Sequence, residues 1–308
     1  MLEITFRAMG CQMKAVVDAD NPVAEATLRQ VPAWFEEWEA KLSRFRPDSE
    51  LCHVNARGGG WQRVSNTMLA VTTAAVRAAG LTGGLVDPTV LPALEFAGYD
   101  RGFELGLGQG PVREAPDGIP AGMWSAVKID EADSRIWLPP DVRIDLGGIA
   151  KGWAADQAAN RLSRLGPALV DAGGDIAVRG PRRDGHPWAI DIDGLGDEAG
   201  EPLGLLVVED GFVATSGRDR RRWSGPAGDQ HHLIDPRTAA PSRSDVVRST
   251  VIAADGLQAE AAAKASLLLG HSLGLGWLHG QPATEGLLIG DHGQAWASRG
   301  WDAFVWKG

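Results

Sequence analysis

The stretch Ile144-Asp145-Leu146-Gly147-Gly148-Ile149-Ala150-Lys151-Gly152 decides how the middle of this chain folds. We predict a strand over 142–145 and a turn at the glycine pair, because glycine allows close backbone approach. A helix should begin after Gly148 and run to about Leu165. The free N–H groups of its first turn, with Lys151 beside them, suit an anion. The alternative is a plain strand–helix corner with a surface lysine.

Three further segments break ordinary patterning. Asp171-Ala172-Gly173-Gly174-Asp175 follows a predicted strand and is either a simple turn or part of a site. Thr215-Ser216-Gly217 precedes four arginines within residues 218–222, which either form a solvated face or hold an anionic ligand. In His231-His232-Leu233-Ile234-Asp235-Pro236-Arg237-Thr238, a histidine near an aspartate is either an acid–base group or structural. Each segment alone is weak evidence for a functional site. Their combination and their order along the chain are the informative features.

Composition excludes several classes of protein. The chain has 308 residues, 44% hydrophobic and 23% charged, unlike a disordered chain, a collagen or a coiled coil. Its net charge of −10 argues against a nucleic-acid binder. No apolar run approaches the roughly 18–20 residues of a membrane span, so we expect no membrane insertion. The start MLEITFRAMG lacks targeting features, and Cys11 and Cys52 show no CxxC spacing, so we expect a cytoplasmic protein with reduced thiols.

The expected elements mix strands and helices without a regular alternation, which favours an α+β fold. An amphipathic helix should cover 22–42, capped by Asn21. Other helices are expected over 66–79 and 257–270. Strands are expected over 3–18, 125–129, 135–138, 168–171, 175–178, 188–193, 204–208, 212–215, 248–254, 286–290, 294–297 and 303–306. No linker separates two domains, so we predict one domain over 1–308, with the Gly- and Pro-rich stretch 100–122 as the only candidate boundary.

Seven segments occur in an order that points to one protein family. They are Met9-Gly10; Leu42-Ser43-Arg44-Phe45 with Ser49-Glu50 and Asn55 beyond; Gly84-Leu85-Val86-Asp87-Pro88-Thr89-Val90-Leu91-Pro92; and the segments 145–152, 171–175, 215–217 and 232–238. This order resembles the ApbE family, the FAD:protein FMN transferases. The matching segments span residues 9 to about 270, nearly the whole chain.

The resemblance implies a fold, an activity and a set of site residues. It implies an α+β unit with an FAD cleft between two halves. It implies a transferase that splits FAD at its pyrophosphate, attaches FMN covalently to a Thr or Ser of an acceptor flavoprotein (flavinylation), and releases AMP. His232 and Asp235 would be catalytic, with His232 as the acid–base or phosphate partner. The implied cofactor contacts are Met9, Phe45, Leu85, Val86, Asp87, Asp145, Lys151, Ser216 and Ile234.

The resemblance also implies a Mg²⁺ site, and here the chain departs from the family. The family carries an Asp and a Thr on a late helix, which bind the ion with a backbone carbonyl at the position of Gly148. Glu260 stands for the Asp and Lys264 for the Thr. Glutamate still offers oxygen ligands, but a protonated lysine cannot bind Mg²⁺. Glu260 and Lys264 are therefore either a plain i,i+4 surface pair, or Lys264 takes the place of the metal as a catalytic residue.

Three functions remain open from the sequence. The retained His232, Asp235, Ser216 and Lys151 favour the FMN transferase. The departures at 260 and 264 also allow an FAD-binding protein without turnover, or an FAD pyrophosphatase that gives FMN and AMP.

Overall fold

The computed structural model describes residues 1–102, 121–195, 202–225 and 228–307. The chain divides into two compact units. We call Met1–Glu36, Lys151–Arg220 and Ser244–Gly308 the sheet unit, and Glu37–Ala150 with Arg221–Arg243 the helical unit. Both contain helices and strands, so the predicted α+β class is confirmed. The single domain over 1–308 stays a prediction, and most of its candidate boundary at 100–122 lies outside the described residues.

The sheet unit is built on an eight-stranded antiparallel sheet in the order β1-β2-β6-β7-β10-β15-β16-β17. Its strands are β1 (Leu2–Ala8), β2 (Cys11–Val17), β6 (Ala168–Ala172), β7 (Asp175–Arg179), β10 (Gly211–Gly217), β15 (Val246–Ala253), β16 (Glu285–Gly290) and β17 (Ala295–Ala297). The remaining elements of this unit are α1 (Pro22–Leu28), α6 (Ala150–Leu162), β8 (Trp188–Ile192), β9 (Gly204–Val208), α7 (Gly256–His279) and η4 (Trp301–Ala303).

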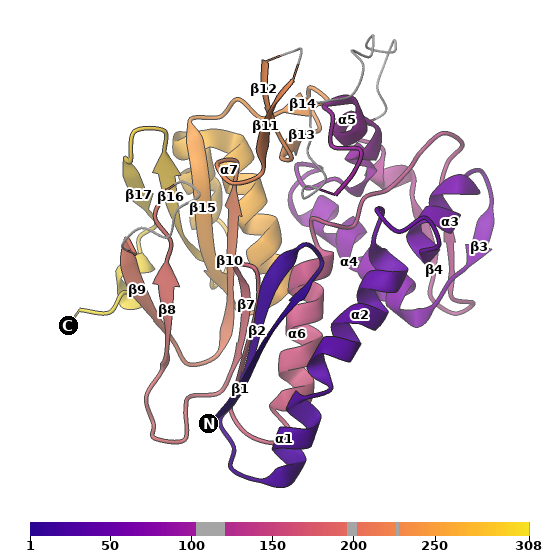
Figure 1. Cartoon of the computed structure of the whole chain (residues 1–308). Helices are drawn as coiled ribbons and strands as arrows, with labels where there is room; N and C mark the ends of the chain where they lie inside the picture. Colours follow the sequence, from indigo (N-terminus) through magenta and orange to yellow (C-terminus); the bar gives the residue numbers. More distant parts are fainter. Residues whose placement is uncertain (103–120, 196–201, 226–227, 308) are drawn as a thin grey trace. The chain divides into compact units, whose positions relative to one another are not determined.

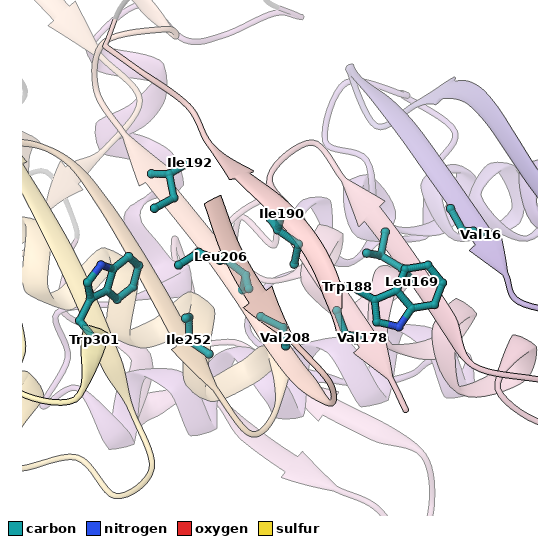
Figure 2. Packing of buried hydrophobic residues seen from close by; sticks show 11 residues of the cluster. Val16, Leu169, Val178, Trp188, Ile190, Ile192, Leu206, Val208, Ile252 and Trp301 are labelled. Carbon is teal, nitrogen blue, oxygen red and sulfur yellow. The ribbon is translucent and has the colours of Figure 1, made fainter. Parts of the chain in front are cut away.

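Both faces of this sheet are covered. On one face α7 packs against β10, β15 and β16 (Figure 1). The β8–β9 hairpin covers the other face and buries alternate residues of β8, as the two-residue period of a strand requires. Figure 2 shows these side chains packed with Val16, Leu169, Val178 and Ile252 of the sheet and with Trp301 of η4. Along β10, Phe212 lies toward the start of α7 and Val213 belongs to the hairpin's cluster.

The helical unit contains shorter elements around a small aromatic core. Its helices are α2 (Val31–Leu42), which begins before residue 37, α3 (Glu50–Ala56), α4 (Asn66–Leu81), η1 (Pro88–Val90), α5 (Leu91–Phe96) and η3 (Trp124–Ala126). Its strands are β3 (Trp61–Arg63), β4 (Lys128–Asp130), β5 (Arg135–Trp137), β11 (Arg222–Gly225), β12 (Gly228–His231), β13 (Ile234–Asp235) and β14 (Ala240–Pro241). Tyr99, Trp223 and Ile234 form its core with Ala93 and Leu94.

Several predicted elements are wrong in detail. The strand over 3–18 is a hairpin, β1–β2, that turns at Met9 and Gly10, both with positive φ. The helix over 22–42 is two helices, because the ring of Pro32 clashes with the carbonyl of Leu28 in a continuous helix. Residues 142–145 are not a strand, and 303–306 overlap the short helix η4. Neither cysteine forms a disulfide bond. Within the described residues, no helix has the length and apolarity needed to cross a membrane.

Candidate active site

The predicted site residues fall in both units, and the FAD cleft between two halves stays a prediction. The helical unit holds Phe45, Leu85, Val86, Asp87, Asp145, Gly148, His232, Ile234 and Asp235. The sheet unit holds Met9, Lys151, Ser216, Glu260 and Lys264.

In the helical unit, Arg44 connects several of these residues. Its Nε lies 3.2 Å from Asp145 Oδ1, and its Nη1 donates a hydrogen bond of 2.7 Å to the Tyr99 carbonyl. The guanidinium carbon is 4.1 Å from the Phe45 ring centroid and 4.5 Å from that of Tyr99, close enough for attraction by both π faces. The Arg44 side chain is 7% exposed, and within the described chain its Nη2 has no hydrogen-bond partner. A buried donor of this kind requires an acceptor.

An aromatic group extends from this arginine. The Tyr99 ring centroid is 5.6 Å from that of Phe45, 5.6 Å from that of Trp223 and 6.5 Å from that of His232. Phe45 is 40% exposed, so its ring is open to a planar ligand. Ile234 belongs to the same core. Through Arg44 and Tyr99, the structure therefore brings Phe45 and Asp145 close to His232.

The two neighbouring histidines have different surroundings. Nδ1 of the buried His231 accepts from Leu233 N at 3.2 Å, so the proton is on Nε2, which donates to Ser242 O at 2.8 Å. His232 Nδ1 lies 3.4 Å from Arg221 O, and its ring forms a T-shaped pair with the ring of Tyr99. His231 is thus fixed by structural hydrogen bonds, whereas His232 lies at the aromatic group.

Asp235 is bound by Arg237. Its carboxylate accepts hydrogen bonds from Arg237 N at 2.9 Å, from Nε at 2.9 Å and from Nη2 at 2.7 Å. Most of its lone pairs are therefore engaged. The catalytic role of Asp235 stays a prediction, and this geometry favours a residue that orders the 232–238 turn.

Asp87 presents a second buried polar atom. Its Oδ1 accepts from both the backbone N and the hydroxyl of Thr89 at 2.7 Å, but within the described residues its buried Oδ2 has no partner. Burial raises the pKa of Asp87 against the lowering effect of the Thr89 donors. Leu85 and Val86 precede it after Gly84, where a Cβ would lie 2.8 Å from Trp124 Nε1, so only glycine fits without a shift.

In the sheet unit, four charged side chains meet. Lys151 pairs with Asp175, and its Nζ is 3.5 Å from Ala172 O. Lys264 Nζ lies 3.8 Å from Glu260 Oε1, and Glu260 is only 1% exposed. Burial, helped by the negative charge of Asp175, raises the pKa of Glu260 to about 8 against the effect of Lys264 and Lys151. This is not a plain surface pair.

The last glycine of the first motif makes room for this group. A Cβ on Gly152 would lie 2.7 Å from Glu260 Cδ. Since real Cβ contacts are not this short, a larger residue at 152 would displace Glu260. Gly152, the last residue of the segment 145–152, therefore packs closely against Glu260 of α7.

Met9 and Ser216 belong to the eight-stranded sheet, Met9 in its first turn and Ser216 on β10. Met9 has φ 49° in the β1–β2 turn, a strained backbone for a residue other than glycine. Ser216 is buried on β10 opposite Ser249 of β15. In the arginine run, Arg218 and Arg220 pair with Asp291 and Asp193 at 2.6 Å. These two arginines are thus part of the structure of this unit.

Comparison with known proteins identifies the family. The sequence profile of the ApbE family matches residues 9–288. This chain belongs to the ApbE family. The FAD:protein FMN transferase of Vibrio cholerae is 30% identical over 249 residues, 80% of this chain and 74% of that protein. The FAD:protein FMN transferase of Escherichia coli K12 is 27% identical over 273 residues, 86% of this chain and 77% of that protein.

Solved ApbE structures have the same fold. The ApbE protein of Thermotoga maritima superposes with a TM-score of 0.84 at 25% identity, over 99% of each chain. The flavin transferase ApbE of Vibrio cholerae gives a TM-score of 0.77 at 25% identity, over 98% of each chain.

The described residues do not fit the Mg²⁺ ion that the ApbE motifs imply. In the part of the chain that the structure describes, no three His, Cys, Asp or Glu side chains form a metal-binding group. Glu260 has an ammonium group 3.8 Å away instead of a hydroxyl ligand, and Lys151 adds a second cation to the group. Mg²⁺ requires nearly octahedral oxygen ligands, and two ammonium groups would repel it. Gly148, whose backbone carbonyl the ApbE motifs imply as a further ligand of the ion, lies in the turn before α6.

The ApbE motifs alone do not reveal three residues of the helical unit. Arg44 occupies the variable position of its motif, and Tyr99 and Trp223 lie outside all seven segments. Tyr99 is the only tyrosine of the chain, which was the one available signal. Their importance depends on contacts between residues distant in sequence, such as Trp223 Nε1 with Ala97 O at 2.9 Å.

Proposed function

We propose that this protein is an FAD:protein FMN transferase. It takes FAD as its substrate, splits the pyrophosphate, attaches FMN to a Thr or Ser hydroxyl of an acceptor flavoprotein and releases AMP. The observation that carries this proposal is the family match over residues 9–288, shared with relatives that bear this name. The cytoplasmic location expected from the sequence stays a prediction.

The transfer step uses one base and charge stabilisation. The acceptor hydroxyl oxygen bonds to the phosphorus of the FMN half, the bond from that phosphorus to the bridging oxygen breaks, and AMP leaves with that oxygen. The hydroxyl proton passes to a base, for which His232 is our candidate. Its ring lies beside that of Tyr99, with the ring centroids 6.5 Å apart, and this position in the aromatic group supports the assignment.

The helical unit offers groups that suit the flat parts of FAD. The exposed Phe45 ring can stack on a flavin or adenine. Arg44 Nη2 and Asp87 Oδ2 are buried polar atoms that lack partners within the described residues. A flavin carries both carbonyl acceptors and an N–H donor, and such polar groups would satisfy these atoms. We therefore propose Arg44 as a cofactor contact alongside the contacts predicted from the sequence.

One experiment separates the transferase from its alternatives. The purified protein is incubated with FAD and an acceptor flavoprotein domain, or with the same domain whose target Thr is replaced by Ala. AMP is measured by chromatography, and covalent flavin by fluorescence in a denaturing gel. A transferase releases AMP and labels only the Thr-containing acceptor. AMP without acceptor indicates a pyrophosphatase, and bound FAD without AMP indicates a binding protein; either result overturns the proposal.

A further inference from the structure

The pair Glu260 and Lys264 is unusual for two charged residues one turn apart on a helix. Glu260 is 1% exposed, and within the described chain neither of its carboxylate oxygens has a partner in hydrogen-bonding geometry. Lys264 is 16% exposed, and its ammonium is held at 3.8 Å by Glu260. The buried Glu260 carboxyl group therefore lies beside the ammonium of a lysine that is itself partly exposed.

The neighbours of this pair add a second cation. Lys151, at the start of α6, pairs with Asp175 at the start of β7. Asp175 and Lys151 both lie close enough to affect the charge of Glu260. Three separate segments thus bring two ammonium groups and two carboxyl groups together. Such a group attracts an anion with several oxygen atoms, because each ammonium offers charge-assisted hydrogen bonds.

We propose that the Lys264 ammonium, held in place by Glu260, gives the FAD diphosphate the positive charge that a divalent metal ion would otherwise supply. Binding and transfer then need no Mg²⁺. The inference rests on the proposed function for its substrate. Lys264 donates hydrogen bonds to the phosphate oxygens, including the bridging oxygen that leaves with AMP. Glu260 is a positioning residue, since it acts through Lys264.

The first test uses the wild-type protein. The Kd for FAD and the rate of AMP release are measured with EDTA and with added Mg²⁺. We expect the two conditions to agree within about two-fold, since no metal-dependent interaction is lost. FAD binding or AMP release that disappears on chelation and returns with Mg²⁺ overturns the inference.

The second test separates a role toward phosphate from a role in folding. Lys264→Thr is compared with wild type for binding of FAD and of riboflavin, which has no phosphate. We expect the Kd for FAD to rise by about 10- to 100-fold, the effect of losing a charged hydrogen bond, and the Kd for riboflavin to stay within about two-fold. Equal losses for both ligands, or none for FAD, overturn the inference.

Matched variants complete the design. Lys41→Thr removes the lysine of an exposed pair with the same spacing, where Lys41 Nζ lies 2.7 Å from Glu37 Oε1, and should change neither Kd. The double variant Glu260→Asp with Lys264→Thr should bind FAD more tightly when Mg²⁺ is added. If this double variant binds FAD as tightly as the wild-type protein does when no Mg²⁺ is present, the inference is contradicted. If wild type releases no AMP with any acceptor, the proposed function fails, and the comparison of FAD with riboflavin still decides the role of Lys264.

Discussion

The Asn55 side chain forms two hydrogen bonds with the backbone of Ile144. Its Nδ2 donates to the Ile144 carbonyl at 2.9 Å, and Ile144 N donates to its Oδ1 at 2.8 Å. The next residue, Asp145, donates from its backbone N to the Pro88 carbonyl at 2.7 Å. A side-chain amide thus takes the place of a neighbouring strand. Asn55 holds the segment that presents Asp145 to Arg44.

Asn55→Ala should therefore destabilise the protein and weaken FAD binding. The variant leaves two backbone groups of Ile144 without partners, and one buried unsatisfied group costs about 1–3 kcal/mol. We expect a loss of that size in the free energy of unfolding, measured by urea titration, and a higher Kd for FAD. His53→Ala, an exposed change on the same helix, is the control. Unaltered stability in Asn55→Ala would show that the segment is held by other contacts.

This contact explains where sequence analysis of the first motif succeeded and where it failed. The helix after Gly148 was predicted because the glycine pair and the apolar spacing are local signals. The predicted strand over 142–145 was wrong, because the backbone of Ile144 bonds to one side chain from 89 positions earlier and not to a neighbouring strand. Hydrophobic periodicity and strand propensity give no information about such a long-range contact. The late helix was predicted to end at 270, whereas α7 continues to His279; Gly270 is a break within it, with φ 79°.

The candidate site shows the same division. Motif order was sufficient to propose Asp87, Asp145, His232 and Glu260 as site residues, and these assignments stay predictions. The position of Arg44 between two rings depends on Tyr99, 55 residues later, and was not predictable from spacing. The burial of Glu260 was not predicted either. The i,i+4 spacing of Glu260 and Lys264 also fits an exposed surface pair, and the burial follows from the packing of α7 on the sheet.

His232→Ala should slow FMN transfer while FAD still binds. Losing a general acid–base group typically costs about 10²-fold or more in rate. The rate is followed by covalent flavin fluorescence on the acceptor, and the Kd for FAD by quenching of flavin fluorescence. Turnover equal to wild type would remove His232 from the mechanism.

His231→Ala is the matched comparison and should give a different result. Both ring nitrogens of His231 are engaged within the structure, so this variant should lose stability. We expect about 1–3 kcal/mol in the free energy of unfolding, from unsatisfied buried groups. At a temperature where it remains folded, its transfer rate should be close to that of wild type. A rate loss as large as in His232→Ala would show that the two histidines are not separate in function.

Arg44→Lys should weaken FAD binding even though the charge is retained. Lysine cannot keep the planar contacts to Phe45 and Tyr99 while it donates to Asp145 and a ligand. Loss of a charged hydrogen bond predicts a Kd for FAD higher by about tenfold or more. Arg46→Lys, which changes a more exposed arginine paired with Glu39, should leave the Kd within about two-fold. Calorimetry gives both values, and equal affinities for wild type and Arg44→Lys would exclude Arg44 as a contact.

Asp171 provides a prediction about stability and pH. Its Oδ1 accepts from Gly174 N at 2.8 Å in the turn between β6 and β7. Burial is the main cause that raises the pKa of Asp171, and the charge of Asp175 adds to it, whereas the Gly174 N–H and Lys151 lower it. The folded protein therefore favours the protonated carboxyl. The stability from this group is fully present below the unfolded pKa of about 4 and is lost as the pH rises through the higher folded pKa.

Asp171→Asn should consequently raise the free energy of unfolding at neutral pH, and the gain should shrink as the pH falls toward the unfolded pKa of aspartate. Asparagine keeps the oxygen that accepts from Gly174 and never acquires the charge. Asp184→Asn is the control of opposite sign. The backbone N–H of His186 and the charge of Arg182 lower the pKa of this exposed carboxyl, so its contribution is present at neutral pH and is lost on acidification. Urea titrations of the three proteins from acid to neutral pH measure both effects. A gain for Asp171→Asn that is independent of pH would mean that the charge of Asp171 is not its cause, and a loss at neutral pH would mean that Asp171 is stabilised as the carboxylate in the folded protein.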